Sequence, residues 1–130
     1  MTRAGFNADD LEKRLIAFGA NIINLTTSLP RTPQGQHIGR QILRSGTATA
    51  ANYGEARGAE SRSDFVHKLA VVQKELNETA IWLQMIEKSS YLPPEKIVAL
   101  LAENRELSRI ITASLRTAKG LNKAQVSDSH

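Results

Sequence analysis

The sequence predicts an all-α protein, an antiparallel up-down four-helix bundle formed by one domain at residues 1–123. Four separate segments have the residue spacing of an α-helix with one buried face. In the first three segments the inner residues recur at alternating steps of four and three, and in the fourth they form a broader face. Short stretches that contain proline, glycine or serine separate these segments. Amphipathic helices with short connections typically form such a bundle.

The first predicted helix follows Asn7, whose side chain we expect to cap it, while residues 1–7 form a loose arm. Ile16 and Ile23 add apolar surface beside its seam, and Pro30 and Pro33 end the helix. The seam consists of Leu11, Leu15, Phe18, Ile22, Leu25 and Leu29.

The second predicted helix, from about Gln34 to Arg57, has a seam whose side chains become smaller along the chain. Small residues let a neighbouring helix approach closely, and that helix must then supply the bulk. Gly58 is expected to end this helix. Its seam consists of Ile38, Ile42, Ser45, Thr49, Asn52 and Ala56.

The third predicted helix, from about Ser63 to Ser89, supplies that bulk, and Ser61 or Ser63 is expected to cap it. We expect Leu76 to be buried by helices on both sides. The seam consists of Phe65, Leu69, Val72, Leu76, Thr79, Leu83 and Ile86.

The fourth predicted helix begins near Pro94 and stops at Gly120, and residues 124–130 are expected to form a disordered C-terminal tail. Its broad inner face consists of Ile97, Leu100, Leu101, Asn104, Leu107, Ile111, Ser114, Leu115 and Ala118.

A structural polar network is predicted between the second and third helices. Because buried polar groups need partners, we expect Asn52 to be largely buried and hydrogen-bonded to Glu75 or Glu78, with Thr49 in the same network.

The residues around the second connection resemble the signature of the four helix bundle protein family. The matching motifs are Ala51-Asn52-Tyr53, Glu55-Ala56, Glu60-Ser61-Arg62, Asp64-Phe65, Lys68-Leu69, Lys74-Glu75, Glu78-Thr79 and Trp82-Leu83. Where many relatives read Asn-Ile-Ala-Glu-Gly, this chain has Asn52-Tyr53-Gly54-Glu55-Ala56.

The family includes proteins encoded in intervening sequences of bacterial large-subunit ribosomal RNA genes, and it is similar to the accessory variability protein of diversity-generating retroelements. The resemblance implies an up-down bundle, often assembled into a closed ring of five subunits. It also implies a role centred on nucleic acid or on helping an enzyme that acts on it.

Composition narrows the remaining possibilities. The chain has no cysteine, which excludes disulfides and thiolate metal sites. It has no run of about 18 apolar residues and no apolar signal-peptide region near its start, so we expect a cytoplasmic protein without a membrane partner. The net charge is +4, and the excess lies on the first, second and fourth helices.

The charge pattern of the fourth predicted helix favours binding to nucleic acid, either RNA or DNA. Arg105, Arg109, Arg116, Lys119 and Lys123 fall within an arc of about 80° at 100° per residue. Charges of opposite sign normally alternate along a solvated helix face, so five cations on the same narrow face of one helix are unusual. Arg40 and Arg44 share a second arc with His37 and are candidates for the same role. The alternative is a solvated surface on a structural adaptor for a partner protein.

The sequence offers no catalytic residues and no metal or cofactor site. Asp64 and His67 have the spacing of half a carboxylate-bridged metal site, but the other helices lack a matching pair. Trp82 is expected to pack in the protein or at a subunit interface rather than stack on bases. We therefore predict a non-enzymatic protein.

The apolar surface exceeds what one seam per helix can bury. Ile16, Ile23, Val98 and Ile110 lie outside the seams, and soluble proteins usually avoid or use such patches. The sequence therefore predicts a homo-oligomer, and the resemblance favours a ring.

Overall fold

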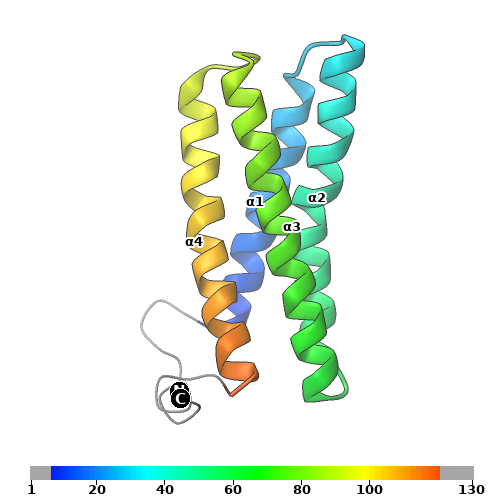
Figure 1. Cartoon of the computed structure of the whole chain (residues 1–130), viewed down its shortest axis with the longest axis vertical. Coiled ribbons are helices and arrows are strands. Elements are labelled where there is room, and N and C mark those ends of the chain that lie inside the picture. The colour runs from blue at the N-terminus through cyan, green and yellow to red at the C-terminus, as the bar shows by residue number, and fades with distance from the viewer. Residues whose placement is uncertain (1–6, 121–130) are drawn as a thin grey trace, which may run out of the picture.

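The computed structural model describes residues 7–120, which form four α-helices that lie side by side and alternate in direction (Figure 1). The helices are α1 (Ala8–Thr27), α2 (Pro33–Arg57), α3 (Arg62–Lys88) and α4 (Pro94–Ala118). Helices that follow one another in sequence pack against one another, and α1 also contacts α4. The predicted all-α four-helix bundle is confirmed. The predicted arm, apart from Asn7, and the predicted tail lie outside the described residues.

Side-chain caps fix where three of the helices begin. The Asn7 side chain accepts a hydrogen bond from the Asp10 amide (2.8 Å), and the Ser61 hydroxyl accepts one from the Asp64 amide (3.0 Å). Both caps were predicted. The cap of α2 is Thr32, whose hydroxyl accepts a hydrogen bond from the Gly35 amide (3.1 Å). Each cap satisfies one of the amides that a helix start leaves without an intrahelical partner.

The core forms where the four predicted seams meet. The whole predicted seam of the first helix is buried, and in α3 all of it is buried except Phe65, which is half-buried. On α4, only Ser114 and Ala118 of the predicted inner face are half-buried rather than buried. Leu76 is completely buried, as predicted. The four-three spacing therefore located the core face of these helices correctly.

The seam of α2 differs from the prediction at Asn52, and Ile38 near its start is half-buried. Tyr53 is buried (4% exposed), whereas Asn52 is only half-buried. At 100° per residue, Tyr53 lies about 20° from Ile42, the centre of the buried arc, and Asn52 lies about 80° away. The four-three alternation assigned the core position to Asn52, but Tyr53, the next residue, occupies it in the structure. Asn52 lies at the edge of the interface.

Polar side chains in the core are all satisfied within the described structure. The Thr79 hydroxyl oxygen lies 2.8 Å from the Ser45 hydroxyl oxygen and 2.8 Å from the Glu75 carbonyl oxygen, so it can accept from the first and donate to the second. The Asn104 side-chain amide donates to the Leu76 carbonyl oxygen (3.0 Å). These bonds join α2 to α3 and α3 to α4 at positions where an unpaired polar group would be costly.

Two glycines of α2 permit close approaches that a methyl group would block. A Cβ atom at Gly46 would lie 2.8 Å from Ile22 Cγ2 on α1. A Cβ atom at Gly35 would lie 2.0 Å from the carbonyl oxygen of Pro30, which belongs to the connection from α1. At Gly39, by contrast, the nearest atom would be Leu29 Cδ1 at 3.5 Å, an ordinary contact.

Ion pairs join the helices around the outside of the core. Arg14 on α1 donates two hydrogen bonds to Glu103 on α4 (2.8 and 3.1 Å). Arg57 at the end of α2 pairs with Asp9 (2.9 Å) and Glu12 (2.8 Å) at the start of α1. Cations near helix ends and carboxylates near helix starts also match the helix dipoles.

We expect Leu76→Ala to lower the free energy of unfolding by about 2–5 kcal/mol, because it removes a completely buried side chain between helices. Chemical denaturation followed by circular dichroism measures the change. The matched control is Ile81→Ala on the same helix, where the side chain is 53% exposed and the loss should stay below about 1 kcal/mol. Equal losses at the two positions would contradict the assigned register of α3.

The two alanine substitutions Gly35→Ala and Gly39→Ala should have opposite effects on stability. Gly35→Ala is expected to destabilise the protein by about 2–3 kcal/mol, because the new methyl group meets backbone atoms that cannot easily move. Gly39→Ala should stabilise it by up to about 1 kcal/mol through helix propensity. Thermal unfolding of both variants measures the difference, and a stabilised Gly35→Ala protein would refute the close approach of Pro30.

Candidate functional site

The first candidate site is the α4 cationic face, which consists of Arg105, Arg109, Arg116 and Lys119. All four side chains are exposed, and the α-helical rise places the first and last about 21 Å apart along the axis. Arg109 pairs with Glu106 at 2.5 Å, while the other three have no ion-pair partner among the described residues. The predicted fifth member, Lys123, lies outside the described residues.

The two predicted cations of α2 differ in their surroundings. Arg40 is exposed and has no ion-pair partner within residues 7–120. The Arg44 guanidinium contacts two carboxylates of α3: one nitrogen lies 3.3 Å from Glu75 Oε1, and the other hydrogen-bonds Glu78. Arg44 therefore takes part in an interhelical ion pair while its side chain stays half exposed, and its predicted contact with nucleic acid stays a prediction.

These contacts of Arg44 affect the titration of the groups involved. Hydrogen bonds from Arg44 and from the indole nitrogen of Trp82 lower the pKa of Glu78 below its usual value. The same carboxylate raises the pKa of Arg44. Both groups are therefore charged at neutral pH, and they join α2 to α3 as an ion pair.

The predicted polar network has different partners from those expected. The Asn52 side-chain amide donates to the Ala48 carbonyl oxygen (2.8 Å), and the Thr49 hydroxyl donates to the Gly46 carbonyl oxygen (2.9 Å). Both bonds stay within α2, so the predicted contact of Asn52 with Glu75 or Glu78 is wrong. Arg44 occupies these carboxylates instead, because its longer side chain reaches across the interface from the neighbouring face of the helix.

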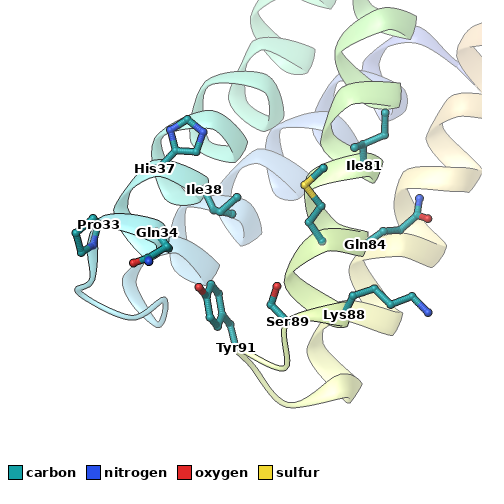
Figure 2. A pocket seen from close by; sticks show the side chains of 10 residues that line it. Pro33, Gln34, His37, Ile38, Ile81, Gln84, Lys88, Ser89 and Tyr91 are labelled. Carbon is teal, nitrogen blue, oxygen red and sulfur yellow. The ribbon is translucent and has the colours of Figure 1, made fainter.

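The second candidate site is a groove of about 810 Å³ between the start of α2 and the end of α3 (Figure 2). Its apolar floor consists of Ile38, Ile81 and Met85. Polar side chains surround this floor, contributed by Gln34, His37, Gln84, Lys88, Ser89 and Tyr91. We refer to this site as the α2–α3 groove. The sequence analysis missed it, although Ile81 and Met85 lie four residues apart and outside the seam of α3, which was the available signal.

Trp82 lies beside the α2–α3 groove. Its ring meets the ring of His37 edge-on, with centroids 6.1 Å apart, and its indole nitrogen donates to Glu78 (3.1 Å). Trp82 therefore contacts both α2 and its own helix, in line with the predicted packing role.

The described residues do not form a metal site or a membrane span. Among residues 7–120, no three His, Cys, Asp or Glu side chains are grouped so that they could hold a metal ion. His67 is exposed and Asp64 is half-buried at the start of α3. No described helix is both long and apolar enough to cross a membrane.

The chain is similar to a known protein family and to a solved structure. The model of the 23S rRNA-intervening sequence protein family matches residues 10–113. A crystal structure of a protein of unknown function from the S23 ribosomal protein family of Bacteroides thetaiotaomicron has a TM-score of 0.77 and 31% sequence identity. The match covers 82% of this chain and 98% of that protein. No curated protein matches the chain.

The family match covers α2 and α3 completely and most of α1 and α4, so it includes the α4 cationic face up to Arg109 and the whole α2–α3 groove. The protein therefore belongs to the 23S rRNA-intervening sequence protein family.

Proposed function

We propose that the protein is a non-enzymatic, oligomeric bundle that binds the backbone of RNA or DNA through the α4 cationic face. One observation carries the proposal. The arc that holds Arg105, Arg109, Arg116 and Lys119 contains no carboxylate, although α4 carries three glutamates elsewhere on its surface. The family name, which refers to 23S ribosomal RNA, is consistent with a nucleic-acid role.

The physical basis of this binding is the attraction between the cations and phosphate groups. Arg and Lys that neutralise phosphates release condensed counterions, so such binding weakens steeply as salt concentration rises. The α4 cationic face has no aromatic side chain, and bases stack mainly on aromatic rings when proteins bind single strands. The contacts proposed here are therefore electrostatic and independent of nucleotide sequence.

Assembly into a homo-oligomer would multiply these contacts. Ile16, Ile23 and Val98 are 47–56% exposed, whereas Ile110, predicted to belong to the same surface, is half-buried and packs against the core. Exposed apolar side chains on α1 and α4 favour association with further copies. In a ring of five subunits, which the family resemblance favours, each subunit contributes one α4 cationic face, and the weak contacts add as avidity.

The proposal needs no cofactor and involves no catalytic step. The proposed partner is an enzyme that acts on nucleic acid, because a bundle that holds RNA or DNA would present this substrate to the enzyme. We expect a protein with this role to act in the cytoplasm. The alternative, an adaptor whose cationic faces are incidental, predicts binding that depends little on salt.

Reversing two cations of the α4 cationic face should weaken nucleic-acid binding. We expect Arg105→Glu together with Arg116→Glu to reduce affinity for a short DNA or RNA duplex at least about tenfold at low salt, because attraction becomes repulsion at two phosphate contacts. The slope of log affinity against log salt concentration should also become shallower. Electrophoretic and anisotropy titrations over a salt series measure both changes.

The matched control for this test is Lys13→Glu together with Lys96→Glu. Both lysines are exposed and have no ion-pair partner among the described residues, and their reversal changes the net charge by the same amount. The control should keep most of the affinity, and light scattering should report the same mass for both double variants. Equal losses in the two variants would show that net charge alone drives binding and would reject the α4 cationic face as the site.

A further inference from the structure

The α2–α3 groove is a surface that the proposed function does not use. Ile81 and Met85 are one turn apart on α3 and remain 53% and 46% exposed. Leu83, which lies between them in sequence, and Ile86, which follows Met85, are buried. Figure 2 shows the side chains of α2 and α3 on the two sides of the groove. Its volume of about 810 Å³ lies in the range of ligand-binding sites, but it is open to solvent along one side.

The polar residues of the groove have hydrogen-bonding capacity to spare. None of the six polar side chains around the floor forms a hydrogen bond with another described residue. No Asp or Glu lines the groove, whereas Lys88 brings a positive charge and His37 a titratable ring. The site therefore combines an apolar floor with hydrogen-bond donors and a cation, and it suits a group that is apolar on one side and anionic on the other.

One edge of the groove is held by a turn in a strained conformation. Ser90 has φ = 57°, in the left-handed region that costs free energy for residues other than glycine. The amide of Ser90 donates to the Glu87 carbonyl oxygen (3.1 Å), and that of Tyr91 to the Ile86 carbonyl oxygen (3.4 Å), which together close the end of α3. This turn places Ser89 and Tyr91 at the groove, where both side chains remain available to an occupant.

We propose that the α2–α3 groove binds an acidic amphipathic segment of a partner protein. Apolar side chains of that segment contact Ile38, Ile81 and Met85, and its carboxylates lie near Lys88 and the surrounding donors. A groove that is open on one side covers one face of its occupant, as in the recognition of an amphipathic helix by a groove. The proposal does not depend on nucleic-acid binding.

A second copy of the chain fits the charge of the groove less well. In a second copy, the apolar patch of Ile16 and Ile23 lies on a helix whose acidic residues are confined to its first turns, where Asp9 and Glu12 already pair with Arg57.

The test uses a defined pair of peptides and the intact protein. One labelled fourteen-residue helical peptide carries leucines at positions i, i+4 and i+7 with glutamates beside them, and its partner carries lysines in place of the glutamates. We expect the acidic peptide to bind at least about tenfold more tightly than the basic one. Binding is followed by anisotropy and by the fluorescence of Trp82, the single tryptophan of the chain, which contacts His37 of the groove.

Variants then locate the binding site. The double variant Ile81→Ser with Met85→Ser should bind the acidic peptide about tenfold more weakly, and Lys88→Glu should shift the preference toward the basic peptide. The control Lys13→Glu and the variant Arg105→Glu with Arg116→Glu should leave peptide binding unchanged, because these residues lie outside the groove. The nucleic-acid proposal and the groove proposal can therefore fail independently of each other. Circular dichroism verifies that each variant is folded.

Three outcomes would overturn the proposal. The first is that the acidic peptide does not bind at millimolar concentration. The second is equal affinity for the two peptides, which would mean that the carboxylates are not recognised. The third is a fall in the mass of the Ile81→Ser with Met85→Ser variant by light scattering, which would identify the groove as a contact between copies of this chain.

Discussion

The close approach of α2 to its neighbours is the constraint on which the rest of the fold depends. Small side chains on its inner face allow α1 to come so near that Ile22 occupies the space where Gly46 would otherwise carry a Cβ atom. On the other side, the Ser45 hydroxyl contacts Thr79, and the long apolar residues of α3 fill the remaining volume. Larger residues on α2 would push both neighbours away, and the contacts of α3 with α4 would move with them.

The sequence predicted the fold well because helix periodicity is a local property. Each seam could be read within one segment, and the structure departs from it mainly where Tyr53 replaces Asn52 in the core. Pairings between helices depend on the relative register of segments far apart in sequence, and periodicity does not report that register. This is why Arg44 appeared to be a free cation, although Glu75 and Glu78 lie against it. The α2–α3 groove was missed for the same reason, since its residues come from two helices.

The charged residues of the protein fall into two groups with different roles. Arg14, Arg44, Arg57 and Lys68 each pair with carboxylates of another helix and hold the bundle in register. Exposed pairs of this kind contribute little to stability individually, so their value lies more in specifying which helices align. Arg105, Arg116 and Lys119 have no ion-pair partner among the described residues, and this second group gives α4 its positive face. A count of charges alone could not have separated the two groups.

The even number of antiparallel helices has a practical consequence for work with this protein. Ala8 and Ala118 lie at one end of the bundle, and the turn that contains Ser90 lies at the other (Figure 1). A probe attached at Ala8 or Ala118 would therefore lie most of a helix length away from the α2–α3 groove. Donor and acceptor dyes placed at the start of α1 and the end of α4 would report on fraying of α1 from α4, the pair of helices that Arg14 and Glu103 bridge.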